Sequence, residues 1–199
     1  MAIPTEPGLT EGQRRDKQTG LVQPWFTHPA LDVVQAWDLR GKSVLEWGGG
    51  CSTAWWADRV GPTGRVTTVE CNWYSEWWPR LQEMAATYPW VALHNLPIED
   101  YQRAVDGEAW GLLLPGQAPQ WDIVIVDGQP THLRTNCLRS ALLLPRPITI
   151  ICDNFMQDRV YDDKDAAVMM APYPGELHIQ ADHTDHDGHG WQTAIWRLP

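Results

Sequence analysis

The sequence lacks several features that would place it in a class at once. No apolar run approaches the length that crosses a bilayer, and the N-terminal segment is polar where a secretory leader would be apolar. The cysteines show no paired spacing, so we expect reduced thiols at Cys51, Cys71, Cys137 and Cys152. These absences predict a cytoplasmic protein with no membrane partner.

Positive charge is scarce as well. Fifteen Lys and Arg residues stand against 25 Asp and Glu residues, which leaves a net charge of −10. An acidic surface repels a phosphate backbone, and no stripe of Lys and Arg marks a nucleic-acid groove. We therefore expect a small-molecule substrate rather than a nucleic acid. A homodimer is compatible with this composition.

Length and composition are those of one globular domain. Of the 199 residues, 43% are hydrophobic and 20% are charged. We expect a single domain over residues 1–199, with an N-terminal arm (1–26) and a core (27–199). Residues 1 to about 20 show no periodicity and are predicted to form a loose tail or arm.

Tryptophan is abundant, with 13 residues, and several occur in adjacent pairs, Trp55-Trp56 and Trp77-Trp78 among them. A helix cannot bury both members of such a pair on one face. We therefore expect some of the indoles to lie at the surface or to line a pocket.

Strands and helices alternate along the chain. The first helix is expected to start at Thr27 or His28 with Pro29 in its first turn. Residues 96–120 are assigned no more than one short helix and a loop. The pattern predicts an α/β fold, a Rossmann-like seven-stranded, mostly parallel sheet with helices on both faces and a C-terminal antiparallel hairpin. The expected strands are 43–47, 65–70, 91–95, 121–127, 148–152, 176–181 and 191–196, and further helices are expected at 51–60, from 75, at 131–143 and at 160–170.

The first strand runs directly into Gly48-Gly49-Gly50 and then into a helix. Bare backbone N–H groups and a helix N-terminus beside the end of a strand suit a nucleotide-like ligand. A dinucleotide-binding turn needs a third glycine, and Thr53 stands in its place.

Glu46 lies inside this strand, two positions before the first glycine. Glu46-Trp47-Gly48-Gly49-Gly50 resembles the first motif of the class I S-adenosylmethionine-dependent methyltransferases, an acidic residue followed by x-Gly-x-Gly. The terminal hairpin fits that family too, and the resemblance covers nearly the whole chain from about residue 27. It implies methyl transfer from S-adenosylmethionine. The alternatives are an NAD(P)-dependent oxidoreductase and a non-catalytic S-adenosylmethionine-binding protein.

S-adenosylmethionine is a sulfonium cation without phosphate, so its site needs hydrogen-bond acceptors. Glu46 is expected to accept from the cofactor's amino group, and Glu70, at the end of the second strand, from both ribose hydroxyls. Glu99 is a candidate for the adenine amino group, with a plain surface acid as the alternative. The full set of expected cofactor contacts is Glu46, Gly48, Gly49, Gly50, Ser52, Glu70, Cys71, Asn72, Glu99 and Asp127.

Asp127 ends the fourth strand, and Asp153 and Asn154 end the fifth. Neighbouring parallel strands would bring these oxygens together, and Mg²⁺ prefers such donors. The set resembles the metal-dependent O-methyltransferase branch (catechol, caffeoyl-CoA and macrolide-sugar or macrocin types). There the metal binds a vicinal diol and lowers its pKa. Without a metal, Asp127 is an acid facing cofactor or substrate, and Asp153-Asn154 is a turn.

The chain departs from that branch at its catalytic lysine, since Pro130 occupies the position. His132 is the nearest candidate base beside Asp127, and Arg134 could bind an acidic substrate group. A turn rich in Asp and His (182–189) offers a second metal cluster, a base or only a solvated loop; its histidines are His183, His186 and His189. We expect this turn on the cofactor edge, and the arm to close the pocket through Trp25, Phe26 and His28.

Overall fold

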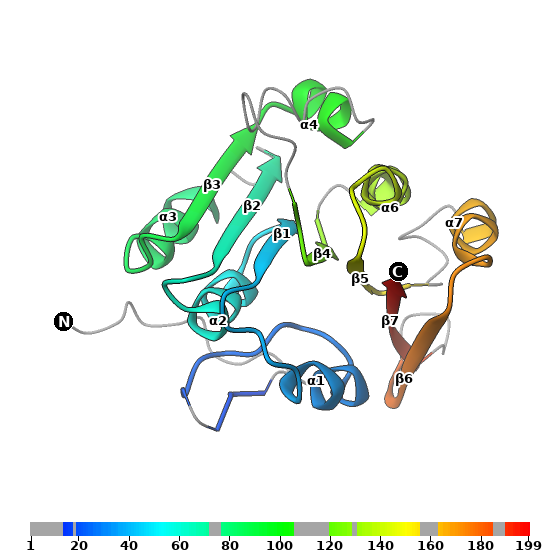
Figure 1. Ribbon diagram of the computed structural model, residues 1–199, viewed down its shortest axis with the longest axis horizontal. Helices are drawn as coiled ribbons and strands as arrows, with labels where there is room; N and C mark the ends of the chain where they lie inside the picture. The colour runs from blue at the N-terminus through cyan, green and yellow to red at the C-terminus, as the bar shows by residue number, and fades with distance from the viewer. Residues whose placement is uncertain are drawn as a thin grey trace.

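The computed structural model describes residues 14–17, 19–71, 77–105, 120–128, 131–155, 163–184 and 190–199 (Figure 1). Its strands form one seven-stranded sheet in the order β3-β2-β1-β4-β5-β7-β6. Five neighbouring strands are parallel, and β7 runs antiparallel to both β5 and β6, which confirms the predicted fold class. The strands are β1 (Ser43–Trp47), β2 (Arg65–Cys71), β3 (Val91–Leu96), β4 (Ile123–Val126), β5 (Ile148–Asp153), β6 (Gly175–Thr184) and β7 (Gly190–Leu198).

Helices cover both faces of this sheet, because side chains alternate along each strand and both sets are apolar. Val44 packs toward α1 and α2 on one face, whereas Leu45 and Trp47 pack toward α4, α6 and α7 on the other. The described helical segments are α1 (His28–Gln35), α2 (Cys51–Val60), α3 (Trp77–Ala85), α4 (Ile98–Val105), the 3₁₀ turn η1 (Thr131–Leu133), α6 (Arg134–Leu142) and α7 (Asp163–Met170). None of them is long and apolar enough to span a membrane.

The N-terminal arm packs onto helix α2 instead of forming a loose tail, as far as its described residues show. Trp55 and Trp56 are both fully buried, with their rings edge to face at 4.7 Å. Trp55 Nε1 donates to the carboxylate of the buried Asp16 at 3.0 Å, and Phe26 packs against Trp56. Both members of this pair are therefore buried, because the arm supplies a second layer of cover, whereas the exposed Trp25 meets the expectation that some indoles lie at the surface.

The carboxyl ends of the parallel strands share one edge of the sheet. Strand β6 runs parallel to β5, since both are antiparallel to β7, so its end at Thr184 reaches that same edge as predicted. Residues 185–189 of the Asp/His-rich turn lie outside the described residues. All four cysteines are thiols outside any disulfide.

Candidate functional site

Three carboxylates gather at the carboxyl edge of the sheet. Glu46 comes from β1, Glu70 from β2, and Asp127 follows β4 directly. Burial, together with repulsion from Glu46 and Asp127, raises the pKa of Glu70 to about 8, although a backbone N–H of Gly49 favours its charged form. A cation bound beside these carboxyls would relieve their mutual repulsion and favour their charged forms, so the end of the glycine loop is suited to a cation.

Glu46 is fully buried and binds the protein's own hydroxyl groups. Ser52 Oγ donates to Oε1 at 2.6 Å, while Thr53 Oγ1 and Thr68 Oγ1 donate to Oε2 at 2.5 and 2.8 Å. Burial raises its pKa to about 7 against these three hydrogen bonds. Glu46 thus fastens the start of α2 to β2, and its contact with the cofactor stays a prediction. Thr68 was missed, although it pairs in register with Glu46.

The three consecutive glycines differ in the contacts that a side chain would make at each position. Gly48 has a φ of 92°, and a Cβ there would lie 2.4 Å from the Cα of Gly128. A Cβ at Gly49 would meet Thr68 Cγ2 at 2.5 Å. Both positions therefore require glycine, because other atoms of the protein already lie where a Cβ would be.

Gly50 is different, because a Cβ there would meet nothing nearer than Trp77 Cζ2 at 3.6 Å. Trp77 Nε1 donates to the Gly49 carbonyl at 2.9 Å, and the Gly49 N–H donates to Glu70 Oε1. The loop is thus held from both sides at Gly49. At Gly50 a Cβ would make only ordinary van der Waals contacts, so packing within the described protein does not require glycine there.

Arg134 connects several groups of the described protein at this edge, although the sequence suggested that it could bind an acidic substrate group. It is only 3% exposed and faces the protein interior instead. Its Nε donates to the Gly128 carbonyl at 2.9 Å and its Nη1 to the Asp153 carbonyl at 3.1 Å. Its Nη2 donates to both the carbonyl and Oδ1 of Asp127, at 2.9 and 3.0 Å. Arg134 thereby joins the carboxyl ends of β4 and β5.

The expected metal ligands do not form an oxygen cage. Asp153 is 5% exposed, and Thr193 Oγ1 donates to its Oδ1 at 3.1 Å. Asn154, with a φ of 53°, makes the tight turn that follows. Across the part of the chain that the structure describes, no group of three or more His, Cys, Asp or Glu side chains could hold a metal ion. With a guanidinium already bonded to Asp127, these donors do not fit a divalent cation.

Thr193 connects this edge to the N-terminal helix. The Thr27 N–H donates to Thr193 Oγ1 at 2.9 Å, and the His28 N–H donates to Gln180 Oε1 at 2.9 Å. Phe26 is buried against α2, so the expectation that it closes the pocket is wrong. Trp25 is exposed and stacks edge to face on Trp191, which keeps it available at the surface.

The remaining predicted residues are scattered around this edge. His132 is exposed on η1, and Glu99 is exposed in the first turn of α4. Cys71 is buried at the end of β2. Ser52 is engaged with Glu46. Asn72 and the side chains of the turn 182–189 lie outside the described residues.

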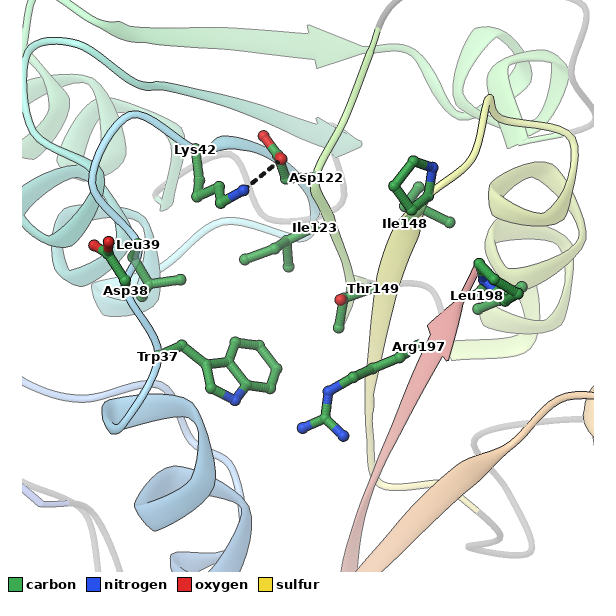
Figure 2. Close-up of a pocket in the computed structure, with 12 residues that line it drawn as sticks. Trp37, Asp38, Leu39, Lys42, Asp122, Ile123, Ile148, Thr149, Arg197 and Leu198 are labelled. Atoms are coloured by element: carbon green, nitrogen blue, oxygen red, sulfur yellow. Dashed lines mark hydrogen bonds and ion pairs between the residues drawn. The ribbon is translucent and has the colours of Figure 1, made fainter.

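A cavity of about 460 Å³ lies at the opposite, amino edge of the parallel strands (Figure 2). Lys42 and Asp122 form an ion pair at 3.0 Å on its wall, and Arg197 lies 5.5 Å from the ring of Trp37. Ligands of open parallel sheets bind beyond the carboxyl ends of the strands, so this cavity is not the cofactor site.

The fold has relatives among solved structures. No protein-family model matches the chain, and no curated protein matches its sequence. The O-methyltransferase TomG from Streptomyces achromogenes, solved with S-adenosylmethionine, is 21% identical with a TM-score of 0.56, over 79% of this chain and 74% of that one. A Bacillus cereus O-methyltransferase, solved with S-adenosylhomocysteine, is 20% identical with a TM-score of 0.55, over 78% and 74%.

A protein described as an rRNA methylase from Clostridium thermocellum is 13% identical with a TM-score of 0.58, over 86% of this chain and 94% of that one. At such identities a likeness establishes the fold. The chain therefore has the Rossmann-like fold of the class I S-adenosylmethionine-dependent methyltransferases, with the acidic loop and terminal hairpin in their expected places.

Proposed function

We propose that this protein is an S-adenosylmethionine-dependent methyltransferase that methylates an oxygen of a small-molecule acceptor. The observation that carries the proposal is the gathering of Glu46, Glu70 and Asp127 around the glycine loop, in a fold shared with O-methyltransferases. A bound sulfonium cation favours the charged forms of these carboxyls and is stabilised by them. The pyrophosphate of a dinucleotide would be repelled by each carboxyl that is charged.

The loop itself also argues against a nicotinamide dinucleotide. Phosphates bind such loops through free backbone N–H groups. Here the Gly49 N–H donates to Glu70, and the Gly50 N–H donates to Thr53 Oγ1 at 3.1 Å. The donors a pyrophosphate needs are thus engaged with oxygens of the protein, which favours a cofactor without phosphate.

Asp127 is the residue best placed to accept the acceptor's proton. Its side chain is 27% exposed, Arg134 holds Oδ1, and no group in the described part of the chain donates to Oδ2. Burial raises its pKa despite the opposing effect of Arg134, so it is a stronger base than a solvated carboxylate. As the O–CH₃ bond forms, the S–CH₃ bond breaks toward sulfur and the hydroxyl proton passes to Oδ2. His132, exposed nearby in sequence, is the second candidate base.

A small molecule is a better acceptor for this chain than RNA. One structural relative is described as an rRNA methylase, but the net charge of −10 here repels a phosphate backbone. The expected Mg²⁺ ligands do not fit the ion, and the proton transfer to Asp127 involves no metal.

Calorimetric titration with S-adenosylmethionine, S-adenosylhomocysteine and NADH tests the proposal. The first two should bind and NADH should not. Glu70→Gln should weaken S-adenosylmethionine binding about tenfold or more, because the carboxylate that accepts from the ribose becomes a neutral amide. Glu83→Gln, on the exposed side of α3, is the matched control and should bind as the parent does. Binding of NADH alone would instead indicate an oxidoreductase.

Turnover is the second readout. S-adenosylhomocysteine formation should be screened with simple phenols, catechols and hydroxy acids as acceptors. Cofactor binding without product from any of them would favour the non-catalytic binding protein, and Asp127→Asn should abolish any turnover that is found.

A further inference from the structure

The guanidinium of Arg134 is enclosed by oxygen atoms. Three backbone carbonyls, from Asp127, Gly128 and Asp153, and one carboxylate oxygen of Asp127 accept its hydrogen bonds at 2.9–3.1 Å. Carbonyl and carboxylate oxygens are also the ligands that a hard divalent cation prefers. The chain has therefore built the oxygen-rich surroundings of a cation site and placed a side-chain cation within it.

Burial makes this arrangement specific to a guanidinium. A buried charge is tolerated only when it is paired and its donors are satisfied. The flat fork of arginine reaches both strand ends at once, which a compact ammonium cannot do. Arg134 is the first residue of α6, so the helix that covers β4 and β5 also delivers the charge.

We infer that the guanidinium of Arg134 takes the place of a metal ion beside the methyl acceptor. It occupies the position between the ends of β4 and β5 where a divalent ion was expected, and it excludes that ion. As a positioning residue it also holds Oδ1 of Asp127, which leaves Oδ2 for the acceptor hydroxyl. This second role rests on the proposed function, whereas the exclusion of metal does not.

A guanidinium in place of a divalent ion changes what the site requires of the methyl acceptor. A divalent ion selects acceptors with two adjacent oxygens that can chelate it. A guanidinium whose hydrogen bonds go to the protein makes no such selection. A single hydroxyl is then sufficient in the acceptor, and an adjacent second hydroxyl brings no advantage.

The test uses Mn²⁺ as the probe, because its electron paramagnetic resonance signal falls when it binds protein. The full chain and Mn²⁺ are mixed at about 100 µM each, with and without S-adenosylhomocysteine. We expect the signal to equal that of buffer. One bound Mn²⁺ per chain that is lost in Asp127→Asn would overturn the inference.

Variants of Arg134 sharpen this result. Arg134→Ala removes the charge and exposes the oxygens, so it should gain one Mn²⁺ per chain, whereas Arg134→Lys keeps a charge and should not. A purely structural role for Arg134 predicts no gain of metal. Lys42→Ala is the matched control, because it also frees an aspartate next to β4 and should bind no Mn²⁺. A folded Arg134→Ala chain without bound Mn²⁺, or a folded Arg134→Lys chain with it, would contradict the inference.

Should Arg134→Ala fail to fold, the parent chain and Asp127→Asn still decide the outcome. Titration of the same samples with S-adenosylmethionine separates the two proposals. If the cofactor does not bind but Mn²⁺ is still excluded, the proposed function fails and the inference about Arg134 stands.

Discussion

Strand β4 has an aspartate next to each end, and each aspartate pairs with a cation at 3.0 Å. At the amino edge Asp122 meets Lys42 beside the open cavity of Figure 2, and the two side chains are 39% and 45% exposed. At the carboxyl edge Asp127 meets Arg134, whose side chain is 4% exposed. The two ion pairs therefore have equal distances but different interaction energies, because the effective dielectric differs between the two edges.

The two edges also differ in what surrounds each pair. The Lys42 side chain donates to Asp122, which in turn accepts the Ser43 N–H at 2.8 Å. Arg134 instead joins two strands through backbone carbonyls. The amino-edge pair only anchors the first residue of β1, whereas the carboxyl-edge pair fixes the positions of the two strand ends that border the candidate site.

Arg134→Ala should have the largest effect. Removing one partner of a buried pair leaves uncompensated charge and unpaired carbonyls, so we expect the free energy of unfolding to fall by about 3–5 kcal/mol. Urea denaturation followed by tryptophan fluorescence measures it. A loss below about 1 kcal/mol, the range of exposed pairs, would remove the contrast between the two edges.

Gly48→Ala should come next, with a loss of about 2–4 kcal/mol, because its φ is unfavourable and its Cβ would strike the backbone of Gly128. Gly50→Ala is the matched variant in the same loop. It should keep its unfolding midpoint, because its Cβ would make only ordinary van der Waals contacts, yet it should bind S-adenosylmethionine more weakly, since the added methyl group would stand on the loop that the cofactor is expected to approach. Equal stabilities for the two variants would contradict the assignment of these glycines.

The pH dependence of the cofactor-free chain is the third prediction. Glu46 and Glu70 have folded pKa values near 7 and 8, both raised from 4.5 by burial, so the folded state retains their protons longer than the unfolded state. The contribution of these two protonated groups to stability should be complete below pH 4.5 and should fall by several kcal/mol in total as the pH rises from 4.5 to 8. Thermal melts across this range measure the fall, and Glu70→Gln should flatten it. A melting temperature that rises over the same interval would contradict the pKa shifts.

Lys42→Met should have the smallest effect, at most about 1 kcal/mol, because water screens both members of the pair. The same urea titration measures it, and added salt should reduce the difference from the parent chain. A larger loss would show that the amino-edge pair also supports the sheet.

Local sequence determined much of the fold. The strand Ser43–Trp47 and the helix Cys51–Val60 occur where they were expected, and the remaining strands agree to within a few residues. Apolar alternation and glycine breaks are properties of neighbouring residues, so they can be read without knowing the partners. The position of Glu70 at a strand end, beside the glycine loop, followed in the same way.

Tertiary structure alone decided which groups meet. The three hydroxyls on Glu46, the docking of Asp16 on Trp55 and the inward turn of Arg134 all depend on contacts between separate elements. The sequence placed Asp127 and Asp153 at strand ends and predicted a cation between them on the condition that the two strands are neighbours, which the structure shows. That the cation is a guanidinium from α6 was decided by packing, because only the assembled edge buries Arg134 deeply enough to require these oxygens.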